Sequence, residues 1–75
     1  MTVLTVDTKG LSCPLPILWA KKAISSLEPG DTLEVLTTDP AAVDDFQAFS
    51  RATGHELSEW SEDGGVFRFL LKKCV

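Results

Sequence analysis

The strongest restriction on the fold comes from the alternation of strand-like and helix-like segments within only 75 residues. Two amphipathic helical patterns separate short segments rich in β-branched residues, and this alternation is typical of βαβ units. Because such crossovers are right-handed, both helices should cover the same face of the sheet. We therefore expect an α/β two-layer sandwich (α+β) of order β-α-β-α-β-β, in which two helices cover one face of a four-stranded mixed sheet. The expected segments are strand 2–6, helix 14–27, strand 32–38, a helix that starts at Asp39-Pro40 and ends before Gly54, and strands 55–60 and 66–72.

The spacing of apolar residues predicts which side chains form the core. Residues three and four positions apart share one face of a helix, so each helix should bury one such stripe. The chain has no internal repeat, low-complexity run or linker, so residues 1–75 should form one small domain. The predicted core comprises Ile17, Ala20, Ile24 and Leu27, then Ala42, Phe46, Phe49 and Ala52 or Thr53, with Leu33 and Val35 of the second strand and the aromatic residues Trp19, Phe67 and Phe69.

Composition and charge argue against several classes of function. The chain is 44% hydrophobic and 24% charged, as in an ordinary soluble globule. Its formal net charge is −4, whereas nucleic-acid binders need a basic surface, so we expect no direct nucleic-acid binding. No apolar run approaches the roughly 18 residues that span a bilayer, and the N-terminal segment lacks the features of a secretory signal. We therefore expect a cytoplasmic protein with no membrane association.

One short segment, Gly10-Leu11-Ser12-Cys13-Pro14-Leu15-Pro16, carries the chemistry. If Pro14 is the first helical residue, Cys13 is the N-cap, where unpaired backbone N–H groups and the helix dipole favour a thiolate. The pKa of this thiol should therefore lie below that of a free cysteine. Because both prolines lack an N–H, the activation should be modest and come mainly from the amides of Leu15 and Ile17. The prolines also hold the turn in a fixed conformation.

The rest of the sequence offers no clear second thiol, general base or metal site to act with this sulfur. Pro16 occupies the position where a Cys-x-x-Cys dithiol would have its second thiol. The single histidine, His55, has no neighbouring pattern that identifies it as the base of a cysteine protease. Two cysteines and one histidine at these separations barely supply the ligands of a metal site, so we expect no metal and no cofactor. A lone nucleophilic sulfur remains, and such a sulfur can carry a second sulfur atom as a persulfide.

The segment 7–16, the Pro29-Gly30-Asp31 turn and the Asp39-Pro40 helix start together resemble the TusA (SirA-like) family of small sulfur-carrier proteins. The resemblance covers nearly the whole chain, and the Cys-Pro-x-Pro element with the upstream Gly10 is its most specific part. It implies a two-layer α/β sandwich in which Cys13 accepts sulfane sulfur from a cysteine desulfurase or rhodanese and passes it to an acceptor relay protein. The pathways served within the family include tRNA 2-thiouridine formation, sulfur oxidation, thiosulfate use and molybdenum-cofactor maturation, and the motif does not choose among them.

Further residues are candidates for contacts with partner proteins. Apolar residues beside the cysteine and off the main stripe of the first helix are candidates for a small docking patch. The resemblance adds a basic pair in the first helix and acidic positions around the second. A solvated helix face, a helix cap and a dipole partner explain the same charged residues more simply. The candidates are Leu15 and Leu18 for the patch, Lys21 and Lys22 for the basic pair, and Asp39 and Asp45 for the acidic positions.

The sequence leaves two other functions open. The Cys-Pro-Leu-Pro turn also fits a recognition loop in a non-catalytic regulatory or interaction module. Cys13 and Cys74 also fit a thiol-disulfide redox protein, although they lie 61 positions apart in the sequence. Replacing Cys13 by serine separates the first alternative from a sulfur carrier, and replacing Cys74 by alanine separates the second.

Overall fold

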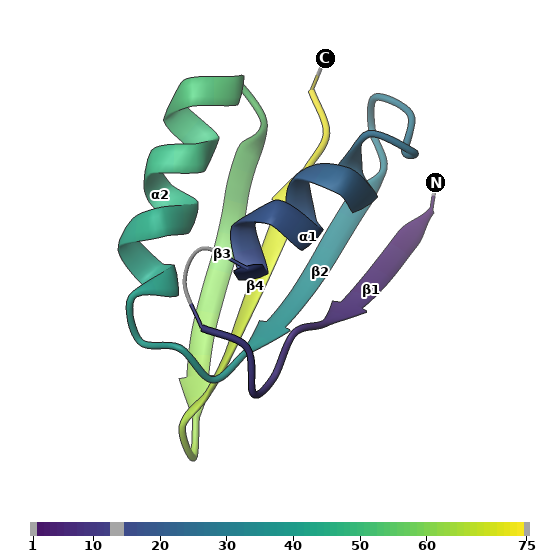
Figure 1. Cartoon of the computed structure of the whole chain (residues 1–75). Helices are drawn as coiled ribbons and strands as arrows, with labels where there is room; N and C mark the ends of the chain where they lie inside the picture. The colour runs from purple at the N-terminus through teal and green to yellow at the C-terminus, as the bar shows by residue number, and fades with distance from the viewer. Residues whose placement is uncertain (1, 13–14, 75) are drawn as a thin grey trace.

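The computed structural model describes residues 2–12 and 15–74 of the chain (Figure 1). Its elements follow the expected order of strand, helix, strand, helix, strand and strand. They are β1 (Val3–Asp7), α1 (Leu15–Ile24), β2 (Thr32–Thr37), α2 (Ala42–Thr53), β3 (Glu56–Asp63) and β4 (Val66–Lys72). No helix within these described ranges is long and apolar enough to cross a bilayer.

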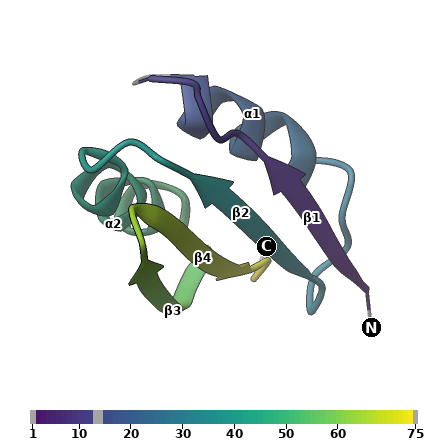
Figure 2. The ribbon, with the colours of Figure 1, turned by 90° about the horizontal axis from the view of Figure 1, so that it is seen from below.

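The four strands form one mixed sheet in the order β1-β2-β4-β3. β1 and β2 are parallel, with Val3 opposite Thr32, and the other two neighbouring pairs are antiparallel. α1 lies over β1 and β2, whereas α2 lies over β4 and β3 on the same face of the sheet (Figures 1 and 2). This arrangement confirms the predicted two-layer sandwich.

The core lies between the sheet and the two helices. Along β2, Leu33, Val35 and Thr37 are buried and the residues between them are half-buried, because successive side chains of a strand point to opposite faces. Phe46 of α2 is fully buried and stacks on Phe69 of β4 with ring centroids 4.6 Å apart. The buried hydrophobic residues are Ala20, Ile24, Leu27, Leu33, Val35, Ala42, Phe46, Phe49, Phe69 and Leu71, and Val6, Ile17, Ala23, Val43, Leu57 and Phe67 pack against them half-buried.

Trp19 does not join this core. Its side chain is 47% exposed, so the prediction that it packs inside the domain is wrong. Ala20 and Ile24 occupy the face of α1 that is turned to the sheet. Successive helical residues are rotated by about 100°, which carries Trp19 away from that face.

Both helices are shorter than predicted, and α1 ends at Ile24 rather than Leu27. The N–H groups of Ser26 and Leu27 donate to carbonyls three residues back, at 3.1 Å each, instead of four residues back. Leu27 is nevertheless buried, as the apolar stripe predicts. The predicted start of this helix at Pro14 lies outside the described residues.

α2 begins at Ala42, two residues after the start that the Asp-Pro pair predicts. Ala41 rather than Asp39 is the N-cap residue, which corrects the predicted cap. The Asp39 carboxylate accepts a hydrogen bond from the Ala41 N–H at 3.0 Å, and the Asp39 backbone carbonyl accepts one from the Ala42 N–H at 3.0 Å. Residues 39–42 therefore form a turn before the helix. Asp45 lies in the first helical turn, as predicted, and Gly54 ends the helix in the left-handed conformation with φ of 82°.

The hairpin between β3 and β4 is tighter than predicted. β3 starts at Glu56 and continues to Asp63, so the turn contains only Gly64 and Gly65 rather than residues 61–65. Both glycines have positive φ, 59° and 86°, as a two-residue type I′ turn requires. β1 and β2 differ from their predicted ends by one residue, and β4 has its predicted limits.

Two carboxylates hold strands and turns together. The Asp31 carboxylate accepts the N–H of Glu28 at 3.0 Å and that of Thr2 at 3.1 Å, and these bonds lower the pKa of Asp31. On the sheet face opposite the helices, Glu34 accepts hydrogen bonds from Arg68 and from the Thr5 hydroxyl, which lower the pKa of Glu34.

These hydrogen bonds predict a loss of stability in acid. A carboxyl with a lower pKa in the folded than in the unfolded chain stabilises the fold above its unfolded pKa. That contribution disappears as the pH falls through the folded pKa. We therefore expect the urea concentration at the midpoint of unfolding to decrease as the pH is lowered below about 4. In a Glu34→Gln protein this decrease should be smaller. Glu56→Gln removes a charge from an exposed strand position and is the control; equal acid profiles for Glu34→Gln and the parent protein would contradict the expectation.

Candidate functional site

The first half of the β1–α1 loop, residues 8–12, is fixed to the carboxyl end of β2. Thr8 is buried, and both its N–H and its hydroxyl donate to the Leu36 carbonyl at 2.7 Å. The Gly10 N–H donates to the Thr38 hydroxyl at 3.0 Å, and the Leu11 N–H donates to the Thr8 carbonyl at 3.1 Å. The loop therefore leaves the sheet along a path that several hydrogen bonds define.

Gly10 has the conformational role that the sequence predicts. Its φ of 85° lies in the left-handed region, which other residues adopt at a cost. This conformation allows its N–H to reach Thr38 across the end of the sheet.

The second half of the loop leads into α1. The Leu15 N–H, one of the two amides expected to stabilise the Cys13 thiolate, donates to the Ser12 carbonyl at 2.9 Å. Pro16, in the first turn, is buried against the rest of the domain. Cys13 and Pro14 lie outside the described residues, and the described chain places only the residues on either side of them.

The loop after β2 lies beside the β1–α1 loop, because Thr38 accepts the hydrogen bond from Gly10. Asp39 follows in this loop and is half-buried, and its N–H donates to the Thr37 hydroxyl at 3.2 Å. Asp45 is half-buried in the first turn of α2. Because β1 and β2 are parallel, α1 and α2 both begin at this end of the sheet (Figure 1). The structure thus brings both predicted acidic positions to the end of the domain where the cysteine loop lies.

An exposed apolar surface runs along α1 from the loop. Leu15, Leu18 and Trp19 are 40%, 53% and 47% exposed, and together with Lys22 they line a shallow hollow. The Lys22 ammonium lies 5.7 Å from the Trp19 ring centroid, within the range of a cation–π contact. Lys21 is also exposed. We call Leu15, Leu18, Trp19 and Lys22 the outer face of α1.

Sequence reasoning missed two kinds of residue at this site. Trp19 belongs to the outer face, although its aromatic character predicts a place in the core. Leu18 and Trp19 follow Leu15 by three and four positions, which places all three side chains on one side of the helix. Thr8, predicted as part of the loop, lies two residues after Val6 and therefore continues the buried face of β1 beyond the end of the strand.

Cys74 lies at the opposite end of the sheet. The Lys73 N–H donates to the Asp31 carbonyl at 2.9 Å, which places this segment beside the start of β2. Cys74 is exposed, and its N–H donates to Nδ1 of the buried His55 at 3.3 Å. Within residues 2–12 and 15–74, no three His, Cys, Asp or Glu side chains gather as a metal site would need.

Comparison with known proteins identifies the family. The sequence model described as "Sulfurtransferase TusA" matches residues 4–73. The chain belongs to the TusA family. It is 53% identical over 68 residues to the sulfur carrier protein TusA of Allochromatium vinosum, which covers 91% of this chain and 90% of that protein. A SirA-like protein from Desulfitobacterium hafniense, whose crystal structure is known, is 27% identical to this chain in sequence. The two structures match over the full length of both chains with a TM-score of 0.81. Sequence similarity therefore shows that the chain belongs to the family, and structural similarity shows that it shares the fold of a SirA-like protein.

Proposed function

We propose that this TusA-family protein carries sulfane sulfur as a persulfide on Cys13 between a donor protein and an acceptor relay protein. Membership of the family supports the carrier role. The observation that carries the proposal is that hydrogen bonds hold the residues on both sides of Cys13 in place. The Leu15 N–H donates to the Ser12 carbonyl at 2.9 Å, and the loop that precedes Ser12 is hydrogen-bonded to the end of β2 and to Thr38. A reactive atom that two proteins must reach in turn benefits from a fixed position.

The transfer itself needs only thiol chemistry. The Cys13 thiolate attacks the terminal sulfur of a donor persulfide, a new S–S bond forms, and the donor S–S bond breaks with the donor thiolate as leaving group. A proton lost by Cys13 is balanced by one taken up by that thiolate. An acceptor thiolate then attacks the terminal sulfur on Cys13 in the same way. The carried sulfur keeps its oxidation state throughout, so the exchange requires no external oxidant or reductant.

The partners in this proposal are a cysteine desulfurase or a rhodanese as donor and a second thiol protein as acceptor. The exposed outer face of α1, with Leu15 and Leu18 nearest the loop, supplies apolar area on which such proteins can dock. Lys21 and Lys22 add positive charge on the same helix, and Asp39 and Asp45 add negative charge beside the loop. Formation of tRNA 2-thiouridine is one pathway that this relay would serve.

Mass spectrometry tests the proposal directly. After incubation with a cysteine desulfurase and cysteine, the protein should gain about 32 Da, one sulfur atom, because each thiolate attacks one sulfur at a time. Peptide mapping should place the added sulfur on Cys13, and a reductant should remove it. Cys74, an exposed thiol of the same chain, is the internal control. An adduct on Cys74 alone, or none with desulfurase and rhodanese donors, would refute the carrier role of Cys13.

The position of Cys74 gives the dithiol alternative no support. Disulfide-bonded cysteines have Cα atoms about 4.4–6.8 Å apart. Cys74 lies beside the start of β2, whereas Ser12 and Leu15 lie beyond the carboxyl ends of β1 and β2. The length of β2, six residues, separates these two ends of the sheet.

A further inference from the structure

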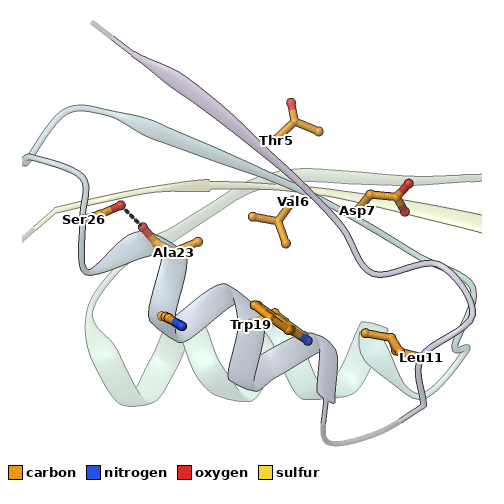
Figure 3. Close-up of a pocket in the computed structure, with 8 residues that line it drawn as sticks. Thr5, Val6, Asp7, Leu11, Trp19, Ala23 and Ser26 are labelled. Atoms are coloured by element: carbon orange, nitrogen blue, oxygen red, sulfur yellow. Dashed lines mark hydrogen bonds between the residues drawn. The ribbon is translucent and has the colours of Figure 1, made fainter.

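A groove runs between the outer edge of β1 and helix α1, with a volume of about 540 Å³. Figure 3 shows Val6 pointing from β1 toward the helix, whereas Thr5 and Asp7 point to the other side of the strand. Trp19 and Ala23 face the groove from α1, and Leu11 closes it at the loop (Figure 3). The lining residues are Thr5, Val6, Asp7, Leu11, Trp19, Lys22, Ala23 and Ser26.

The floor of this groove is a strand edge with free hydrogen-bonding positions. Among the described strands, β1 pairs with β2 alone. The Thr8 N–H and the Thr2 carbonyl are bonded to β2. Because these groups alternate along a strand, the N–H and C=O groups of Val3 and Thr5 point away from β2. An extended chain laid along β1 would find these groups in position for a new ladder.

The other edge of the sheet is protected and this one is not. β3 carries four acidic residues and a register shift between Leu57 and Glu59, and both features discourage pairing with another strand. β1 is Val-Leu-Thr-Val-Asp, in which Val3 is 62% exposed and Leu4 is 36% exposed. Such an open apolar edge is the kind that accepts a further strand. The acidic residues of β3 are Glu56, Glu59, Glu62 and Asp63.

The charge around the groove selects the kind of strand. α1 contains Lys21 and Lys22 and no acidic residue, although the whole chain has a net charge of −4. Lys22 lines the groove itself. Asp7, the acidic residue of the groove, forms an ion pair with Lys9 at 3.8 Å. Because Asp7 is paired with Lys9, the Lys22 ammonium is the charge that the groove offers to a ligand, and it attracts carboxylates.

We propose that this groove binds an extended acidic segment of a partner protein, which adds to the sheet as a strand beside β1. Alternate apolar side chains of the segment lie under α1 against Val6 and Ala23, and a carboxylate reaches the Lys22 ammonium. The inference goes beyond the sulfur relay and does not depend on it. Its place next to Leu11 means that a partner held here is held beside the cysteine loop.

A pair of model peptides of opposite charge tests the proposal. The probe is the acetylated, amidated peptide Glu-Val-Glu-Val-Glu-Val-Glu, and its control is Lys-Val-Lys-Val-Lys-Val-Lys. In a Trp60→Phe protein, Trp19 is the remaining tryptophan and reports on the groove. We expect saturable change of its fluorescence with the acidic peptide alone. Net charge by itself predicts the opposite order, so equal or stronger binding of the basic peptide would overturn the proposal.

Two matched pairs of variants locate the binding. Lys22→Glu should weaken the acidic peptide about five- to tenfold, because an exposed ion pair becomes a repulsion. Lys72→Glu, the same charge change on β4, should alter it less than about twofold. Thr5→Pro removes an N–H from the free edge and should weaken binding at least about tenfold, whereas Thr5→Ala keeps that N–H and should bind nearly as the parent protein does.

Amide chemical shifts keep the test valid if Thr5→Pro does not fold. Addition of the acidic peptide to the parent protein should shift the amide signals of Val3 and Thr5 most strongly. Amide shifts confined to the sheet face opposite the helices or to β3 would overturn the proposal. A dimer in sedimentation without peptide whose dilution shifts the amide signals of Val3 and Thr5 would also overturn it, because such a dimer would place a second copy of the chain on this edge.

Discussion

Replacement of Cys13 by serine is expected to reduce sulfur transfer to the uncatalysed background. A serine hydroxyl does not ionise near neutral pH and forms no persulfide, so both halves of the relay lose their nucleophile. The measurement follows radioactive sulfur from cysteine, through a desulfurase, to an acceptor protein. A loss on the order of a thousandfold or more is expected, as for removal of a covalent nucleophile in an enzyme.

The matched control is Cys74→Ser, which removes the exposed thiol at the other end of the sheet. This protein should transfer sulfur at the rate of the parent. If Cys13→Ser kept full function, the Cys-Pro-Leu-Pro turn would be a recognition loop and the protein a non-catalytic interaction module. If Cys74→Ser lost function together with Cys13→Ser, the dithiol alternative would replace the relay.

Truncation of Phe46 to alanine should cause one of the largest losses of stability of any single core substitution. Phe46 is fully buried, stacks on Phe69 at 4.6 Å and meets Phe49 edge-on at 6.3 Å. Removing such a ring costs about 3–5 kcal/mol in lost burial and cavity formation. A domain of 75 residues is stable by only about 4–11 kcal/mol, so this substitution should remove about a third or more of the free energy of unfolding.

Urea unfolding followed by circular dichroism measures this effect. The control is Leu18→Ala, which also shortens an apolar side chain but at a position that is 53% exposed. It should change the free energy of unfolding by less than about 0.5 kcal/mol. Similar midpoints for Phe46→Ala and the parent protein would show that the aromatic stack contributes little to the fold.

The sequence predicts those parts of the fold in which an element buries one face, because such burial places apolar residues at regular spacings along the chain. The alternation of Leu33, Val35 and Thr37 and the stripe through Ala20 and Ile24 are both present, because each element buries one face against the other layer. The helix ends were less predictable. They depend on whether an N–H bonds three or four residues back, and at the start of α2 on a side chain that bonds a neighbouring amide.

The candidate site shows the same division between local and distant contacts. The exposure of Leu15 and Leu18 follows from helix periodicity, and the left-handed conformation of Gly10 follows from residue type. The anchoring of Thr8 to Leu36 joins residues 28 positions apart, and no local pattern announces it. The motif predicts that Cys13 is the reactive residue, and this assignment stays a prediction.

The hydrogen bonds of Asp31 determine where a label can be attached to this domain. Thr2 donates to the Asp31 carboxylate and Lys73 donates to its carbonyl, so both chain ends leave from one side (Figure 1). The β1–α1 loop lies on the other side, beyond the carboxyl ends of β1 and β2. An affinity tag or a fluorescent protein fused to either terminus should therefore project away from the β1–α1 loop, and immobilised protein should present this loop to the solution.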